Sequence, residues 1–375
     1  MKKPKWAASL QTLVWAFNVE RGLAVFIRTP LNQGIRFDYG KSQEFDPSEF
    51  IQEALLPHLS HYKGDENRSE VNKIAQTILS HPHADHIAGI GRIPVGTDDE
   101  QALRSALHTC PHDKNPEPNL PDERLDWQRV GGAGSDDELL DRYKALYKNR
   151  NLPLQTIKYE PPPGLATVPN LEYAIYYFRP PKVAVEYPND DQEYINGCSI
   201  VLYYRHGSHT LLIPADINPS ILKYILNDDA GTEKRCTRFD RKFAAAHPTW
   251  HERTDSQPSL SKLLGDCDLS ILFAPHHGLE SGFSKDLYDA MHGGKPGLVV
   301  ISDKRKTSNS GNVDARYASQ NGSRGQTVLV DGKKEHRHSI STKNGHHILI
   351  AFQGSGGRPQ VWLESDPYQL LKHIS

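Results

Sequence analysis

One short segment of the chain has the residue types and spacing of a metal-ligand set. It contains three histidines and one aspartate, His81, His83, Asp85 and His86. Imidazole nitrogen and carboxylate oxygen suit zinc best, with manganese or iron as alternatives. In an extended loop His81 and His83 point to the same side and can share one metal, while Asp85 and His86 begin the next turn and can address a second. At a given start these four residues arise by chance about once in 10⁵, so we interpret the segment as a metal site.

Two later segments supply further candidate ligands at the ends of apolar runs. Asp216 closes the run Leu211–Ala215, and His276 and His277 follow the run Leu269–Ala274. A carboxylate at a strand end can bridge two metals. Because α/β proteins build their sites where strand ends meet at one sheet edge, we expect these residues to gather beside the first set.

The elements that must position these residues alternate between strands and helices, which predicts a layered α/β protein. Helices are predicted over 47–58, 137–148, 219–226 and 284–291. Strands are predicted over 13–19, 23–29, 35–38, 74–79, 154–159, 173–178, 199–204, 210–213, 269–273 and 298–302, with a last pair within 339–352. The chain shows no internal repeat, which argues against a solenoid or propeller.

Charge is distributed unevenly along the chain. Residues 98–138 contain eleven acidic and four basic side chains and read as an irregular surface insertion. Residues 229–258 form a second polar insertion. Residues 302–343 contain nine basic and four acidic side chains, and residues 231–253 six and three. The formal net charge of −2 therefore conceals basic stretches that follow the candidate ligands and weakly favour an anionic substrate.

Composition excludes several classes of protein. With 375 residues, 37% hydrophobic and 24% charged, the chain has ample length for a packed core and is not collagen, coiled coil or wholly disordered. It lacks a run of 18 apolar residues, so no membrane span is expected. Its four cysteines lie far apart without a CxxC pair. This argues against a disulfide scaffold and leads us to expect a cytoplasmic protein.

The order of these motifs resembles the metallo-β-lactamase fold superfamily. More specifically, it resembles the metallohydrolase domain of ComEC-type DNA-uptake proteins and their free-standing relatives. The histidine segment is the most specific motif, and the membrane channel domain of ComEC is absent from this chain. The matching segments, in order, are Phe17–Gly22, Ile27–Pro30, Phe37–Gly40, Ser80–Ile90, Asn196–Leu202, Leu212–Asp216, Pro275–Gly278, Val299–Ser302 and Ser341–Gly345.

The resemblance implies a four-layer αββα sandwich made by a single domain over residues 1–375, with insertions at about 92–150 and 229–258. It implies one or two zinc ions, or manganese. His81 and His83 would hold the first ion and Asp85 and His86 the second. Asp216 would bridge, and His276, nearer the strand end than His277, is the preferred remaining ligand. Asp38 would orient a ligand imidazole from behind.

The chain also departs from the family pattern in several places. Asn18 stands where an acidic residue is usual, and Leu23 where an aspartate is usual. Many members of the superfamily have a further histidine before the bridging aspartate, where this chain has Asn196 and Cys198. The third ligand of the first metal is therefore left open.

These features predict a metal-dependent phosphodiesterase or nuclease acting on DNA or RNA. Bound metals would activate water, Asp85 would serve as ligand and proton acceptor, and Lys304, just after a strand end, would border the site. Two alternatives remain open. One is hydrolysis of a small phosphodiester such as a cyclic nucleotide, or of another small anion. The other is a non-catalytic metal-binding scaffold with a protein partner in a multi-protein system, such as those of anti-phage gene clusters.

Overall fold

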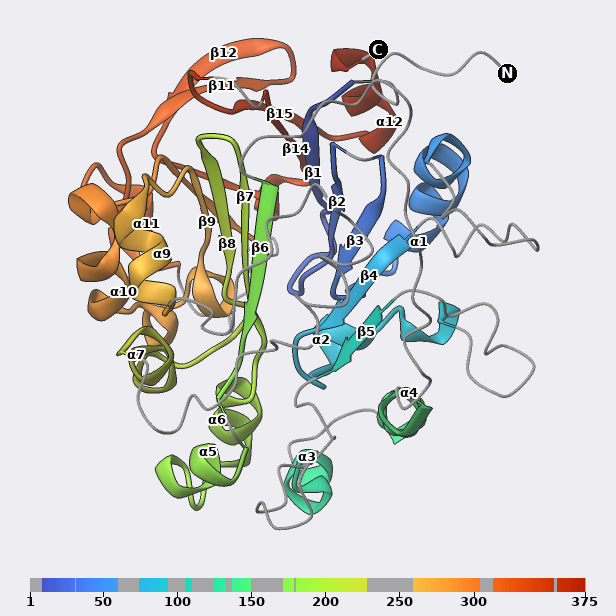
Figure 1. Ribbon diagram of the computed structural model, residues 1–375. Coiled ribbons are helices and arrows are strands. Elements are labelled where there is room, and N and C mark those ends of the chain that lie inside the picture. Colours follow the sequence, from blue (N-terminus) through green and yellow to red (C-terminus); the bar gives the residue numbers. More distant parts are fainter. Residues whose placement is uncertain are drawn as a thin grey trace.

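The structure, a computed structural model, is an α/β arrangement of two mixed β-sheets with helices around them (Figure 1). It describes residues 9–30, 32–59, 74–93, 106–109, 125–132, 137–149, 171–178, 180–227, 259–303, 313–353 and 356–374. All structural statements below refer to these residues.

The larger sheet contains nine described strands and mixes parallel with antiparallel pairs. They are β1 (Thr12–Ala16), β2 (Val25–Arg28), β3 (Gly34–Phe37), β4 (Ile74–Leu79), β5 (Ala106–Thr109), β11 (Gln326–Val330), β12 (Lys333–Arg337), β14 (His347–Phe352) and β15 (Gln360–Glu364). Their order across the sheet is β12-β11-β15-β14-β1-β2-β3-β4-β5. The pairs β3–β4 and β4–β5 are parallel, so the carboxyl ends of these three strands lie at one edge.

The smaller sheet contains six described strands. They are β6 (Leu171–Tyr176), β7 (Val201–His206), β8 (His209–Ile213), β9 (Ile271–Phe273), β10 (Leu298–Ile301) and β13 (Ser339–Ser341). Their order is β13-β10-β9-β8-β7-β6. The strands β8, β9, β10 and β13 run parallel to one another, and their carboxyl ends also share one edge.

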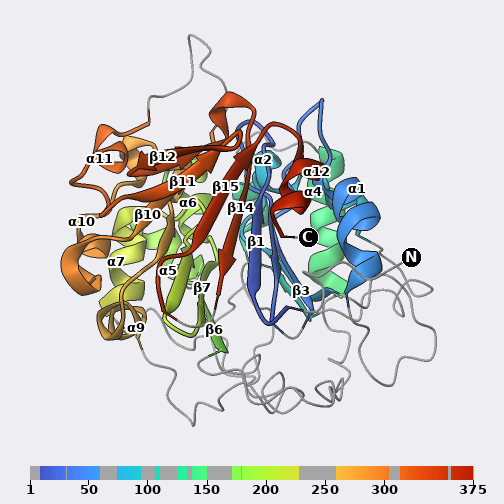
Figure 2. The same ribbon diagram turned by 90° about the horizontal axis from the view of Figure 1, so that it is seen from above.

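The helices are short and lie mostly on the outer sides of the two sheets. They are α1 (Pro47–Phe50), α2 (Ala84–Ile87), α3 (Trp127–Gly132), α4 (Asp137–Asn149), α5 (Pro180–Glu186), α6 (Asp191–Gly197), α7 (Pro219–Asn227), α9 (Leu260–Asp266), α10 (Lys285–Ala290), α11 (Ala315–Ala318) and α12 (Pro367–Leu370). In Figures 1 and 2, α7, α9 and α10 lie outside the smaller sheet, and α1 and α12 lie outside the larger one. No described helix combines the length and apolar character needed to cross a lipid bilayer.

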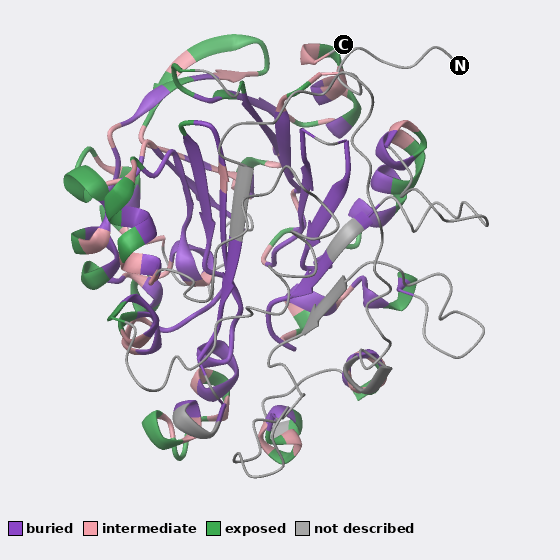
Figure 3. Cartoon of the chain, viewed as in Figure 1, coloured by how far each residue is buried: buried purple, intermediate pink, exposed green. Residues whose placement is uncertain are grey.

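The core is divided by the period-two alternation of the strands. On β1, Val14 belongs to the large buried cluster that also includes Leu202 of β7, so the two sheets share one core. Its neighbour Trp15 belongs instead to a cluster with Phe50 and Leu370, which fastens α1 and α12 to the outer face. Figure 3 shows the resulting pattern of buried strands and exposed outer helix faces. At about 25 cal/mol per Å² of apolar surface removed from water, this burial is the main stabilising contribution.

Hydrogen bonds join the two carboxyl edges at one end of the molecule. The Ile200 amide, just before β7, donates to the Ser80 carbonyl oxygen just after β4, at 3.1 Å. Within the smaller sheet, the His276 amide donates to the Ala215 carbonyl oxygen at 3.0 Å. The loops that follow β4, β8 and β9 therefore lie next to one another. This brings the candidate ligands together at one edge, as the sequence predicts.

Most predicted elements are confirmed, with shifts of a few residues at their ends. The 47–58 helix is interrupted, because α1 continues as a π-helical turn over Ile51–Leu55 and a 3₁₀ turn over Leu56–His58. The turn Gly207-Ser208 joins β7 and β8 as the predicted hairpin. The predicted strand over 154–159 and the insertion over 229–258 lie outside the described residues.

Two predictions about the sheets are wrong. The acidic segment 98–138 is not wholly an irregular insertion, because β5 pairs with β4 and forms an edge of the larger sheet. The segment 339–352 does not form a β pair, because β13 pairs with β10 in one sheet and β14 with β1 and β15 in the other. The sequence reasoning also missed β15 and the β11–β12 hairpin, in which the charged and mostly exposed residues of β12 hide any apolar alternation.

Candidate metal centre

The histidine segment runs from the end of β4 into α2. His81 continues the extended strand, His83 has an extended backbone at the N-cap position, and Asp85 and His86 lie within the single turn of α2. His81 and His83 therefore project to the same side, and their rings meet with His81 Nε2 3.0 Å from His83 Nδ1. This is the arrangement expected from an extended segment followed by a turn.

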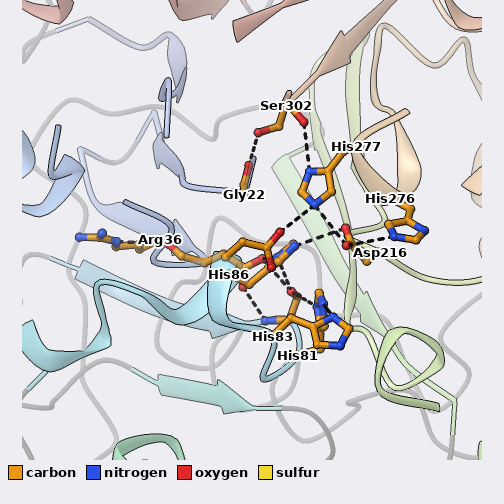
Figure 4. A network of polar contacts seen from close by, with 12 residues as sticks. Gly22, Arg36, His81, His83, His86, Asp216, His276, His277 and Ser302 are labelled. Atoms are coloured by element: carbon orange, nitrogen blue, oxygen red, sulfur yellow. Dashed lines mark hydrogen bonds and ion pairs between the residues drawn. The ribbon is translucent and has the colours of Figure 1, made fainter. Parts of the chain in front are cut away.

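The smaller sheet contributes the other residues of the cluster (Figure 4). Asp216 follows β8 and places its two oxygens against different histidines. Its Oδ1 lies 3.3 Å from His86 Nε2, and its Oδ2 lies 3.2 Å from His277 Nε2. His277 Nε2 also lies 3.2 Å from Asp85 Oδ2, so this imidazole faces carboxylates from both sheets.

Two overlapping ligand groups result. The first is His81, His86 and Asp216, and the second is Asp85, His86 and His277. Within each group the ligand atoms lie within 4.8 Å of one another, and His86 belongs to both. His83, through its contact with His81, extends the first group. All the histidines and aspartates predicted from the three motifs are therefore brought to one place.

The geometry favours His277, and not the predicted His276, as the ligand from this loop. Both residues adopt left-handed backbone conformations, with φ of 48° at His276 and 56° at His277, and these turn the second ring back toward the sheet edge. His276 Nε2 remains 4.0 Å from Asp216 Oδ2, and its Nδ1 contacts Ser281 Oγ at 3.1 Å. Closeness to the strand end in sequence therefore does not indicate which of the two rings faces the carboxylates.

The hydrogen bonds of two histidines fix which nitrogen is free to bind a metal. His277 Nδ1 lies 3.0 Å from the Ser302 carbonyl oxygen, which can only accept, so Nδ1 carries a proton and Nε2 is the nitrogen left to bind a metal. His86 Nδ1 lies 2.7 Å from Asp38 Oδ2 and donates to it in the same way. Metal-binding histidines commonly donate their second nitrogen to a carboxylate or carbonyl oxygen.

Asp38 occupies the expected position behind the ligands, and Ser80 joins it. The Ser80 amide donates to Asp38 Oδ1 and the Ser80 hydroxyl to Oδ2, both at 2.7 Å. Because that hydroxyl donates to the carboxylate, His81 Nδ1 donates to the hydroxyl oxygen, at 2.9 Å. Burial raises the pKa of Asp38 above its ordinary value, and these contacts only partly offset it. The sequence reasoning missed Ser80, although its place directly before His81 was a signal.

Backbone strain is concentrated at this centre. Non-glycine residues with positive φ cost roughly 1 kcal/mol or more each and persist where the surrounding structure holds them. Of the seven such residues in the described chain, four lie here, namely Asp38, Ala215, His276 and His277. The fold thus maintains unfavourable conformations at the positions that aim the candidate ligands.

The carboxylates and imidazoles of the cluster shift one another's pKa values. Burial alone would lower the pKa of His277, but the neighbouring carboxylates, that of Asp216 first, raise it to about 9. They also raise the pKa of His86 well above its ordinary value against the effect of burial. Burial alone would raise the pKa of Asp216, and the two histidines hold it well below its ordinary range. Without a metal, the cluster is a network of protonated imidazoles and ionised carboxylates.

The His81–His83 pair behaves differently from the rest of the cluster. Burial lowers the pKa of His81 well below its ordinary value, and the adjacent His86 and His83 lower it further. Burial also lowers the pKa of His83. Both rings therefore stay neutral and can offer lone pairs to a cation near neutral pH.

Unsatisfied buried atoms supply a direct test of whether a metal fits. His83 Nε2 is buried without a hydrogen-bond partner, whereas His86 Nε2 and His277 Nε2 face only carboxylate oxygens, at 3.2–3.3 Å. A buried polar atom left unpaired costs about 1–3 kcal/mol. A divalent cation among these nitrogens and the carboxylate oxygens would satisfy them, and a mixed nitrogen and oxygen donor set matches zinc. The residues present therefore fit the predicted metal.

Two small polar side chains lie just before β7, in the segment where the family resemblance would place a further histidine. Asn196 Oδ1 and Ser199 Oγ are both buried and unpartnered, and Ser199 precedes the residue that bonds to Ser80. His206 and His209 belong instead to the opposite edge, where His206 Nδ1 lies 3.1 Å from Thr12 Oγ1 at the start of β1. Lys304, the predicted catalytic cation, lies outside the described residues, directly after the described Asp303.

Comparisons with known proteins do not identify a family for this chain. No protein-family model matches the sequence, and no curated protein matches it significantly.

Proposed function

We propose that this chain is a metal-dependent hydrolase of the metallo-β-lactamase fold superfamily, and most specifically a phosphodiesterase acting on DNA or RNA. The observation that carries the proposal is the convergence of two ligand groups from two sheets on the shared residue His86. Two mixed sheets with helices on their outer sides agree with a four-layer αββα sandwich. The order of the motifs along the chain is the second support.

Each residue of the centre has a role in this proposal. His81 and His83 hold a first divalent cation, and Asp85, His86 and His277 hold a second. Asp216 lies between the two groups, because its two oxygens face His86 and His277 separately. Asp38 and Ser80 keep the imidazoles in the tautomers that binding needs.

Bound zinc or manganese ions supply Lewis acidity toward phosphoryl oxygens and lower the pKa of water to near neutrality. The Asp85 carboxylate is 30% exposed, unlike the buried Asp216, and so can accept a proton from an attacking water. The histidines hold its pKa well below the ordinary range against the effect of burial, which keeps it ionised as a metal ligand must be. The burial of the other ligands excludes bulk water and strengthens their electrostatic interactions.

A substrate screen tests the proposal. Zinc- or manganese-loaded protein should hydrolyse at least one of single-stranded DNA, duplex DNA, RNA and a cyclic nucleotide. The double variant His81→Ala, Asp85→Ala should lose that activity. A matched control removes an exposed histidine–aspartate ion pair elsewhere, His292 and Asp268, whose side chains lie 2.9 Å apart.

The pattern of activity separates the alternatives. Turnover of the polymers supports the nuclease, and turnover of the cyclic nucleotide alone supports a small-molecule enzyme. Bound metal without activity on any of the four substrates supports a scaffold and overturns the enzymatic proposal.

A further inference from the structure

The turn between β1 and β2 lies directly against the candidate metal centre. Gly22 has φ of 141°, and a Cβ built on it would lie 2.4 Å from the Asp85 backbone oxygen. The Gly22 carbonyl oxygen accepts a hydrogen bond from the Ser302 hydroxyl. The turn therefore touches both α2 and the residue whose carbonyl oxygen orients His277. Arg21 directly precedes Gly22 in the chain, so its side chain begins one residue away from these contacts.

Arg21 differs from every other arginine whose side chain the structure describes. Among the described residues it forms no hydrogen bond, ion pair or ring contact, and its Nε is buried without a partner. Each of the others is engaged, as Arg129 is with Asp191 and Arg324 with Asp268. The remaining engaged arginines are Arg28, Arg36, Arg92, Arg142, Arg205, Arg316, Arg337 and Arg358. A half-buried guanidinium without a partner is costly unless a ligand supplies one.

A second cation contacts the same segment. The Asp303 amide and carbonyl group both bond to Thr342 Oγ1 at 3.1 Å, which fixes the turn that carries Lys343. Lys343 Nζ forms an ion pair with Asp303 Oδ2 at 3.8 Å, and its side chain is 34% exposed. Gly22, next to Arg21, contacts Ser302, so both cations belong to the surroundings of the Ser302–Asp303 segment. The exposed Glu20 is the acidic neighbour of Arg21.

We propose that Arg21 binds a phosphate group next to the scissile diester of the substrate, with Lys343 as a second phosphate contact at the Ser302–Asp303 segment. This inference rests on the proposed phosphodiesterase function. Guanidinium binds phosphate through paired, charge-assisted hydrogen bonds, for which Arg21 has all its donors available. In a polymer the diester under attack has further phosphates next to it, which a cation beside the centre can bind.

The experiment compares two substrates that differ only in neighbouring phosphates. Bis(4-nitrophenyl) phosphate has one diester and no other phosphate, whereas a thymidine pentanucleotide has several. Arg21→Ala should raise KM for the pentanucleotide about 10- to 100-fold, the loss typical of hydrogen bonds to a charged group. Its kcat, its zinc content and its kinetics on the small diester should stay within about twofold of wild type.

Two further variants sharpen the result. Arg21→Lys keeps the charge but loses the paired geometry and should fall between wild type and Arg21→Ala. Arg337→Ala removes an exposed arginine of β12, paired with Glu335, and should leave KM unchanged. An equal loss on both substrates, or loss of zinc, would show that Arg21 only supports the turn and would overturn the inference.

Failure of the proposed phosphodiesterase function can be distinguished from failure of the inference about Arg21. If the zinc-loaded wild type hydrolyses neither substrate, the phosphodiesterase proposal fails, and the binding of inorganic phosphate to wild type and Arg21→Ala is measured by calorimetry. Weaker phosphate binding by the variant would still support an anion site at Arg21. Equal binding would contradict it.

Discussion

Replacement of Asp38 by asparagine should disable the metal centre without touching a ligand. Asp38 receives three hydrogen bonds on two oxygens, from the Ser80 amide at Oδ1 and from the Ser80 hydroxyl and His86 Nδ1 at Oδ2. Asparagine keeps one oxygen for the Ser80 amide. Its NH₂ group then faces the other two donors, and His86 can accept from it only by moving its own proton to Nε2. That nitrogen faces Asp216 and belongs to both ligand groups.

The expected loss follows from this tautomer change. Substitution of the residue behind a metal ligand typically lowers metal affinity by about 10- to 100-fold, which is about 1.4–2.7 kcal/mol. We expect the upper end of this range for Asp38→Asn, because His86 serves both groups and because the Ser80 hydroxyl, which orients His81, also loses its acceptor.

Zinc affinity, measured by competition with a chelating dye, is the assay. The matched control is Asp46→Asn, the same change of charge at the N-cap of α1, where Asp46 Oδ1 accepts from the Ser48 amide at 2.8 Å. Asparagine caps helices as well as aspartate does, so this variant should bind zinc normally. Thermal melting of the metal-free proteins establishes that both variants fold. A zinc affinity of folded Asp38→Asn within about twofold of wild type would refute the reasoning.

Three further predictions follow from the geometry. His277→Ala should lose bound zinc and His276→Ala should retain it, as measured by elemental analysis, and the opposite result would restore the sequence-based choice. Gly22→Ala should weaken zinc binding because its Cβ collides with the α2 backbone, whereas Gly332→Ala, at another positive φ but in open space, should not; equal zinc affinities would contradict this. Burial lowers the pKa of His347 to about 4, so its neutral form stabilises the fold above the unfolded pKa of 6.5, and this contribution is lost as pH falls from 6.5 to 4. In urea unfolding of the metal-free proteins, the stability of wild type should fall by about 1.4 kcal/mol per pH unit more steeply than that of His347→Gln in that range, and parallel slopes would contradict this role of His347.

The sequence predicted the centre well where short-range rules decide the geometry. An apolar run followed by alternating histidines fixes an extended segment, and Asp85 and His86 then fall in one helical turn. Asp216 and the histidine pair follow parallel strands, whose carboxyl ends must share an edge. That the two sheets meet at that edge could be predicted from the family resemblance, or from the general rule that α/β proteins build their sites at the carboxyl ends of strands.

The remainder depended on contacts that pattern cannot show. The choice between His276 and His277 is made by two left-handed residues, which no periodicity predicts for histidine. β5 lies in an acidic stretch and was hidden because an edge strand needs little apolar sequence. The state of Arg21 could not be read either, since a guanidinium is known to be unpaired only when its surroundings are known.

The zinc content of His86→Ala against wild type tests the central claim most directly, because His86 is the residue that both ligand groups share. After saturation with zinc and dialysis, wild type should retain one or two zinc ions per chain, because the cluster offers the mixed nitrogen and oxygen donors that zinc prefers. Folded His86→Ala should retain almost none. Equal zinc content in the two proteins, whether high or absent, would contradict a metal centre at this sheet edge.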